Sequence, residues 1–207
     1  MYLSKDEKAA GIPKQIENLK KYGLEIKFVD LDLKPHKKYY YAMKEFPDDI
    51  VITMDDDIVY ASNVIDELYK TYKRFPKCVI AARAHEITFN KKGVNNYDDW
   101  NQCCTNSYEP SFLYMATEGA GALYPPHLLN PDILFDLTFI KKYINVDDLW
   151  MKAVEILSDV PVVICDHSLE DKRIEIPSAQ KTALAIQNVG QKQNDVKLKE
   201  LDIDFNI

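Results

Sequence analysis

Three short, continuously apolar segments, separated by helical segments, constrain the fold of this chain more than any other feature. Residues 50–54, 78–82 and 160–165 are rich in β-branched side chains and lack the polar alternation of a half-exposed strand. Such runs are typical of strands covered on both faces, as in parallel sheets with helices on each side. We therefore expect an α/β fold built on a mainly parallel sheet flanked by helices.

Local signals place helices and further strands around these runs. Ser4 and Glu7 have the spacing of a helix capping box, and Pro13 and Gly23 mark the start and end of a helix. We expect helices at residues 13–22, 35–46, 63–75, 147–157 and 178–187. We expect further strands at residues 24–33, 112–115 and 122–124, and a long loop over residues 91–110.

The composition indicates a globular protein and excludes several functional classes. The 207 residues are 46% hydrophobic and 29% charged, which is typical of a chain that buries a core. The formal net charge of −7 argues against nucleic acid as the main partner, because phosphate binding needs clustered lysine and arginine. The sequence has no apolar stretch long enough to span a bilayer and no apolar leader, so we expect a cytoplasmic protein.

Three consecutive aspartates follow the first apolar run directly. Asp55, Asp56 and Asp57 crowd three negative charges, which repel one another unless a cation or protons intervene. In open α/β sheets, ligands bind at the carboxyl ends of strands, where these residues fall. Carboxylate oxygens suit Mg²⁺ or Mn²⁺, which can bridge to a phosphate. We expect a divalent metal site here, and a solvated acidic turn is the alternative.

Five segments match the motifs of one known family in the right order. They are residues 36–40 (HKKYY), 52–60 (ITMDDDIVY), 83–85 (RAH), 119–126 (GAGALYPP) and 146–150 (VDDLW). Over about residues 2–200 the chain resembles bacterial glycosyltransferases with the GT-A fold, related to the family 2-like enzymes of surface-polysaccharide synthesis. The resemblance implies a GT-A-like domain over residues 1–170 and a polar, helical extension over residues 171–207.

The resemblance also implies an activity. A glycosyltransferase of this kind moves a hexose-type sugar from a nucleoside diphosphate donor, most simply a UDP-sugar, to a saccharide or lipid-linked acceptor. Mn²⁺ or Mg²⁺ is the implied cofactor, and the sugar configuration is expected to invert. A lipid-linked acceptor is compatible with peripheral association at the inner face of the membrane.

The residues that match the family's motifs fall into four groups. The catalytic candidates are Asp148, which we prefer as the base, and Asp147. The candidates for donor binding are Lys38, Asp55, Asp56 and Arg83. The candidates for acceptor binding are Gly119, Gly121 and Trp150. The metal candidates are Asp55, Asp57 and His167.

Plainer structural roles are alternatives for several of these residues. Asp147 and Asp148 can cap a helix, where the helix dipole favours negative charge. The two glycines can form an ordinary turn, and Lys38 can simply face solvent. Core packing is an alternative for Trp150.

Two other functional interpretations stay open at this level. Residues 55–59 also fit the D-x-D-x-V motif of haloacid-dehalogenase-like phosphatases, with Asp55 as nucleophile and Lys141 or Lys142 nearby. A non-catalytic relative that only binds nucleotide or sugar is the third interpretation. The family's sheet normally begins with a strand upstream of the first residue here, and we expect its absence to expose a sheet edge that favours homo-oligomers.

Overall fold

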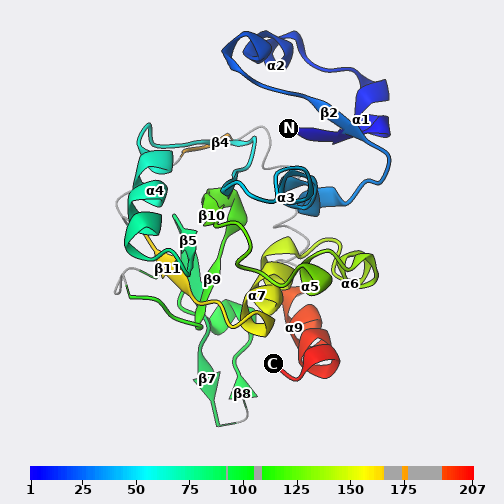
Figure 1. Ribbon diagram of the computed structural model, residues 1–207. Coiled ribbons are helices and arrows are strands. Elements are labelled where there is room, and N and C mark those ends of the chain that lie inside the picture. The colour runs from blue at the N-terminus through cyan, green and yellow to red at the C-terminus, as the bar shows by residue number, and fades with distance from the viewer. Residues whose placement is uncertain (92, 105–108, 166–173, 177–192) are drawn as a thin grey trace.

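The computed structural model describes residues 1–91, 93–104, 109–165, 174–176 and 193–207, and Figure 1 shows its mixed α/β architecture. The α-helices are α1 (Lys5–Ala10), α2 (Lys14–Glu17), α3 (Tyr40–Glu45), α4 (Val64–Arg74), α5 (Pro131–Leu134), α6 (Leu137–Lys142), α7 (Asp147–Leu157) and α9 (Gln193–Phe205). The 3-10 helices are η1 (Asn18–Tyr22), η2 (Lys34–Lys38), η3 (Tyr97–Asp99) and η4 (Glu118–Ala120). The strands are β1 (Tyr2–Ser4), β2 (Lys27–Val29), β3 (Val51–Thr53), β4 (Ile58–Val59), β5 (Val79–Ala81), β6 (Ala84–Glu86), β7 (Phe89–Asn90), β8 (Gly93–Val94), β9 (Tyr114–Ala116), β10 (Ala122–Tyr124), β11 (Val162–Ile164) and β12 (Ile174–Glu175).

The main sheet has four strands in the order β11-β5-β10-β3. β11 is parallel to β5, whereas β10 is antiparallel to both of its neighbours. Three strands therefore share one direction and β10 opposes them, so the expectation of a mainly parallel sheet is wrong and the sheet is mixed. All three residues of β10 are buried, as they would be in a parallel strand, so the apolar run does not reveal its direction.

Helices cover both faces of this sheet, because successive side chains of a strand point to opposite sides. Val79 and Ala81 of β5 pack in the larger hydrophobic cluster, together with residues of α7. Ile80, between them in sequence, packs in a second cluster with Val64 and Leu68 of α4. The arrangement is a helix layer, a sheet layer and a second helix layer.

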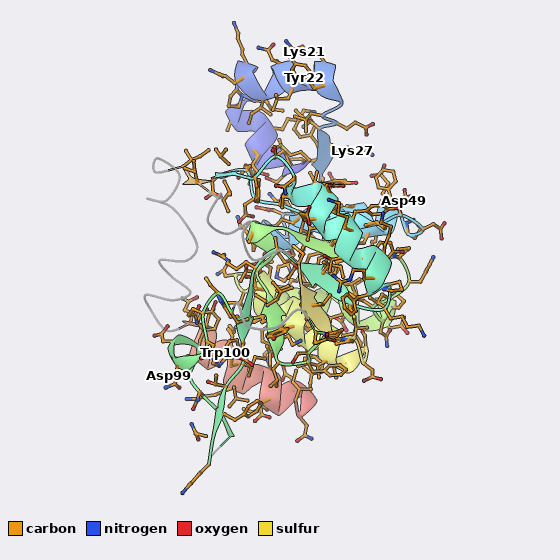
Figure 2. The ribbon with its side chains drawn as sticks, turned by 90° about the vertical axis from the view of Figure 1, so that its left-hand side faces the viewer. Lys21, Tyr22, Lys27, Asp49, Asp99 and Trp100 are labelled. Carbon is orange, nitrogen blue, oxygen red and sulfur yellow. The ribbon has the colours of Figure 1, made fainter. Side chains whose placement is uncertain are left out.

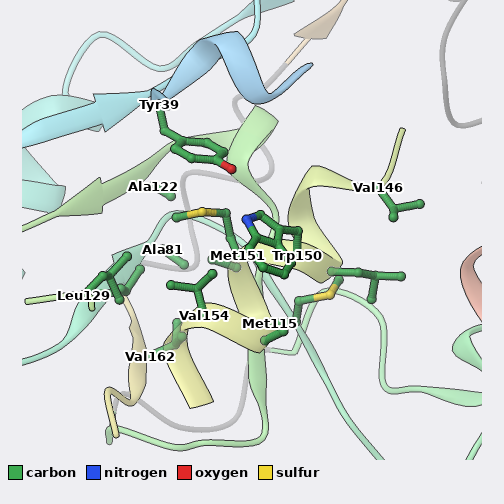
Figure 3. Packing of buried hydrophobic residues seen from close by; sticks show 14 of the residues in the cluster. Tyr39, Ala81, Met115, Ala122, Leu129, Val146, Trp150, Met151, Val154 and Val162 are labelled. Carbon is green, nitrogen blue, oxygen red and sulfur yellow. The ribbon is translucent and has the colours of Figure 1, made fainter. Parts of the chain in front are cut away.

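The larger core surrounds Trp150 of α7, as Figure 3 shows. The Trp150 ring is fully buried and lies nearly parallel to the ring of Tyr143, with a centroid distance of 5.8 Å. The indole nitrogen of Trp150 and the hydroxyl of Tyr39 point toward one another in Figure 3. Stacking against the rings of Phe139 and Tyr143 holds Trp150, and with it α7, in this core.

The N-terminal elements form a small unit beside the main sheet. β1 and β2 pair in parallel as a separate two-stranded sheet, and α1 begins with the expected capping box between Ser4 and Glu7. Lys21 and Tyr22 lie near the outer tip of this unit (Figure 2). Among the described strands, β3 and β11 are the two outer strands of the main sheet, and each pairs with one neighbour in that sheet.

Several elements differ from the sequence-based expectations. The helix expected at residues 13–22 is a short α2 that continues as η1, and the strand expected at residues 24–33 is limited to β2. Pattern analysis did not predict α5, α6 or α9, and the helix expected at residues 178–187 lies outside the described residues. Across the described part of the chain, no helix combines the length and apolar character needed to cross a membrane.

Candidate functional site

Residues from distant parts of the sequence meet at the edge of the main sheet where β3 and β5 end and β10 begins. Ala122, the first residue of β10, pairs with both Thr53 at the end of β3 and Ala81 at the end of β5. Residues 55–57 follow β3, and residues 118–121 precede β10. Because β10 runs opposite to its neighbours, the turn before it lies at the same edge as the residues that follow β3.

Lys38, at the end of η2, lies between Asp55, which follows β3, and Asp147, the first residue of α7. Its Nζ atom lies 2.8 Å from Asp55 Oδ1 and 3.1 Å from Asp147 Oδ2. Burial opposes the charge on Lys38, but the carboxylates of Asp147 and Asp55 hold its pKa well above the usual value. Lys38 is therefore a protonated cation held between two carboxylates, and it is not a freely solvated surface lysine.

Glu118, Asp147 and Asp148 form an acidic cluster beside Lys38. Each offers one carboxylate oxygen, and the three oxygens lie within 4.8 Å of one another. The backbone N–H of Glu118 donates to Asp148 Oδ1 over 2.9 Å, and the Tyr124 hydroxyl donates to Glu118 Oε1 over 3.2 Å. The second carboxylate oxygen of Glu118, Oε2, is buried and has no hydrogen-bond partner among the described residues.

Burial and mutual repulsion change the pKa values of two of these carboxyl groups. Burial, followed by the charge of Asp147, raises the pKa of Asp148 to about 7, while Lys38 and the N–H of Glu118 oppose the shift. Burial also raises the pKa of Glu118 well above its usual value, and Asp147 adds to this effect. Asp147 and Asp148 lie in the first turn of α7, whose N-cap residue is Val146. Asp148 can therefore take up and release a proton near neutral pH.

Close packing fixes Asp55 against the turn that precedes β10. A Cβ atom added to Gly119 would lie 2.0 Å from Asp55 Oδ2, so a larger residue here requires the carboxylate to move. The Tyr60 hydroxyl accepts a hydrogen bond from the Asp55 backbone N–H over 2.7 Å and donates one to the Gly119 carbonyl oxygen. The space beside Gly119 is therefore occupied by the Asp55 carboxylate in this structure.

The other donor-side and metal candidates lie near the same edge. Asp57 is partly buried, and its carbonyl oxygen accepts a hydrogen bond from the N–H of Ile176 over 2.9 Å. Asp56 is exposed to solvent. Arg83 lies between β5 and β6, and its Nε donates to Thr117 Oγ1 over 2.7 Å, which ties it to the residue just before Glu118. Asp57 thus lies two residues from Asp55 in sequence, and Arg83 is joined through Thr117 to the segment that contains Glu118.

Two of the sequence candidates have surroundings that differ from the expectation, and a third lies outside the described residues. Trp150 is fully buried between Phe139 and Tyr143, so the expectation that it stacks on an acceptor sugar is wrong, because its ring has no exposed surface. Gly121 is buried, has a φ of +110° and faces the core beneath α4, which fits the plain-turn alternative. His167 lies outside the described residues.

The proline end of the glycine-rich segment lies away from the acidic residues. Pro125 and Pro126 follow the carboxyl end of β10 and line an apolar hollow of about 200 Å³. The hollow also contains Val51, at the beginning of β3, so it opens at the opposite end of the same strands. The segment at residues 119–126 therefore contributes its first residues, and not its prolines, to the acidic edge.

Sequence reasoning missed Glu118 and Tyr60. Glu118 is an acid within an otherwise apolar or small-residue stretch, which is a usable signal for a buried functional group. Tyr60 follows Asp57 by three residues, and nothing in the spacing indicates that its hydroxyl turns back to the backbone of Asp55. Its contribution depends on the turn between β3 and β4.

The set of donor atoms at this edge fits a hard divalent cation. Carboxylate oxygens are the ligands that Mg²⁺ and Mn²⁺ prefer. Asp55 and Asp57 come from one turn, but the described acids whose oxygens lie within 4.8 Å of one another are Glu118, Asp147 and Asp148, and Glu118 Oε2 is the unpartnered one. Lys38 neutralises part of the negative charge, and the raised pKa values of Glu118 and Asp148 favour their protonated forms, so a cation bound in this cluster would displace protons.

Neither a protein-family model nor a curated protein matches this chain.

Proposed function

We propose that this chain is a metal-dependent glycosyltransferase of the GT-A type, which moves a sugar from a nucleoside diphosphate to a hydroxyl of a saccharide or lipid-linked acceptor. The resemblance of five ordered segments to the glycosyltransferase family supports the proposal. The mixed α/β architecture, with three aspartates directly after the carboxyl end of β3, is compatible with it.

The observation that carries the proposal is the position of Lys38 between Asp55 and Asp147. These three residues come from three separate motifs of the resemblance, and 109 residues separate Lys38 from Asp147. Nothing in an unrelated fold would require these motifs to meet. Their convergence supports a common site for the diphosphate, the metal and the acceptor hydroxyl.

Asp148 is the proposed general base. It takes the proton of the acceptor hydroxyl while the oxygen of that hydroxyl forms a bond to the anomeric carbon of the donor sugar. The bond between that carbon and the diphosphate oxygen breaks, and the nucleoside diphosphate leaves with the electron pair. The pKa of about 7 suits this task, because the carboxylate is then basic enough to accept a proton and largely ionised just above neutral pH.

The residues proposed to hold the metal are Asp55 and Asp57. A Mg²⁺ or Mn²⁺ ion bound there supplies stabilisation of the negative charge that develops on the departing diphosphate. Lys38 and Arg83 contribute positive charge on the same side and orient the phosphates. Lys38 must exchange its contact with Asp55, at least in part, for one with a phosphate.

Calorimetric titration of the nucleotide tests the proposal. We expect UDP to bind in the presence of Mn²⁺ and to lose affinity in EDTA, with GDP and CDP as specificity controls. Folded protein that binds none of the three nucleotides would overturn the proposal. Phosphatase activity that disappears in Asp55→Asn would favour the phosphatase interpretation instead.

Two substitutions separate binding from chemistry. Asp57→Ala should abolish metal-dependent nucleotide binding, because it removes a ligand oxygen from the metal. Asp148→Asn should leave binding intact and reduce sugar transfer by about 10²-fold or more, because it removes the base. Asp66→Asn, at an exposed acid of α4 paired with Lys70, is the matched control and should change neither. A fully active Asp57→Ala protein would contradict the assignment.

A further inference from the structure

Tyr60 is a residue outside all the assigned roles that contacts two parts of the candidate site. Its hydroxyl lies 2.7 Å from the backbone nitrogen of Asp55 and also hydrogen-bonds to the carbonyl oxygen of Gly119. A hydroxyl has one proton to donate. It accepts from the Asp55 N–H and donates to the Gly119 carbonyl oxygen, which is nearer than the alternative acceptor, the Asp55 carbonyl oxygen at 3.2 Å. One side-chain atom thus joins the turn after β3 to the turn before β10, over 59 residues of sequence.

The consequence for Asp55 follows from the space around its carboxylate. Its Oδ2 atom lies in the gap that the missing side chain of Gly119 leaves, and its Oδ1 atom faces Lys38. The carboxylate keeps this orientation only if the two turns keep their separation. The Tyr60 hydroxyl is a link that holds them at that separation, in addition to the pairing of β3 with β10.

We propose that Tyr60 is a positioning residue that holds Asp55 and the Gly119 turn in the arrangement needed to bind the divalent metal. The inference rests on the proposed metal site at Asp55 and Asp57. Tyr60 itself need not touch the metal or the substrate. Outer groups that orient metal ligands typically change metal affinity by about 10- to 100-fold when they are removed.

Tyr60→Phe is the variant that tests this role, because it removes only the hydroxyl. The ring of Tyr60 packs against the cluster around Val64 and Leu68, and phenylalanine preserves that packing. Tyr69→Phe is the control, since Tyr69 lies on α4 and is 46% exposed. Circular dichroism should show the same fold for both variants.

Two measurements on the full chain decide the question. Hydrogen exchange should show faster exchange of the Asp55 amide in Tyr60→Phe than in the wild type, because the N–H loses its acceptor. Titration with Mn²⁺, followed by electron paramagnetic resonance of the free ion, should show about tenfold weaker binding in Tyr60→Phe and no change in Tyr69→Phe.

The outcomes separate this inference from the proposed function. Faster exchange at Asp55 with unchanged Mn²⁺ affinity would show that Tyr60 is merely structural and would overturn the inference alone. Unchanged exchange at Asp55 would overturn it as well, because the hydrogen bond would then not hold the turn. A wild-type chain that binds no Mn²⁺ would overturn the metal site of the proposed function together with the inference.

Discussion

A methyl group added at Gly119 should displace the Asp55 carboxylate and so disturb the candidate site. Its φ lies outside the left-handed region, so alanine is tolerated by the backbone and the effect is purely steric. The added Cβ would lie 2.0 Å from Asp55 Oδ2, and the carboxylate must rotate away from its place beside Lys38. We expect Gly119→Ala to weaken Mn²⁺ binding by at least about tenfold.

The control for this substitution is Gly11→Ala, because a Cβ at Gly11 meets no atom within 4 Å. Calorimetric titration of Mn²⁺ with UDP present measures both variants. Gly11→Ala has a strained φ of +85° and should lose some stability without losing metal affinity. Equal affinities for Gly119→Ala and the wild type would show that Asp55 does not bind the metal in this orientation.

The pH dependence of sugar transfer tests the proposed role of Asp148 as the general base. The proposed base works only when it is ionised, and burial with the neighbouring Asp147 raises its pKa to about 7. The rate constant kcat/KM should therefore fall about tenfold for each pH unit below that value and level off above it. Asp147→Asn removes a negative neighbour, so its profile should shift toward lower pH. A profile that is flat down to about pH 5 would contradict the role of Asp148.

At the scale of single elements, α7 carries a buried pair that should make stability depend on pH. Glu155 and Lys152 are almost fully buried, with 3.2 Å between Lys152 Nζ and Glu155 Oε2. Burial raises the pKa of Glu155 to about 7 from 4.5, while Lys152 opposes the shift. Between these two pH values the folded state holds a proton that the unfolded state releases. The stabilisation is therefore complete below about pH 4.5 and is lost as the pH rises through about 7.

Urea unfolding at a series of pH values measures this effect. From the pKa difference, the contribution of Glu155 to the free energy of unfolding should decrease by about 3 kcal/mol across the window. Glu155→Gln removes the titrating group and serves as the reference, so the wild-type curve should fall relative to it. Parallel curves for the two proteins would show that Glu155 does not titrate there.

The elements also show how far a sequence can predict this fold. The bounds of β10 and α7 agree with the expectations, because Gly121 and Pro125 border the apolar run at residues 122–124 and two aspartates begin the run at residues 147–157. The direction of β10 was not predictable, because its pairing partners, and not its own residues, decide it. α5 is one turn long, and so short a segment has no measurable period.

The candidate site was predictable to a similar extent. The acids after β3 and at the start of α7 stood out because charged residues border apolar runs. The contacts of these acids could not be predicted, because the position of Lys38 between Asp55 and Asp147 depends on how η2 packs. Trp150 is a clear failure, because a tryptophan in a motif and a tryptophan in a core look alike in sequence. Burial distinguishes them only in the folded chain.

At the scale of the whole molecule, α9 ties the end of the chain to the main core. Figure 1 shows it beside α7, and Leu201 is 3% exposed within the larger hydrophobic cluster. Lys142 of α6 pairs with Asp204 over 2.6 Å. The carboxylate of Asp195 accepts a hydrogen bond from the N–H of Tyr97 over 2.7 Å, which joins α9 to η3. These contacts connect the expected C-terminal extension to elements of the expected catalytic domain.

If α9 is an integral part of the core, weakening its packing should lower the free energy of unfolding of the whole protein. Leu201→Ala removes a buried side chain and should lower the free energy of global unfolding by about 2–5 kcal/mol. Ile203→Ala, two residues away and 81% exposed, should stay within about 0.5 kcal/mol of the wild type. Urea unfolding followed by tryptophan fluorescence and by circular dichroism measures both. Coincident transitions are expected, because Trp150 and α9 share one core. An early transition in Leu201→Ala that leaves the tryptophan signal unchanged would instead make α9 a separate, weakly attached unit.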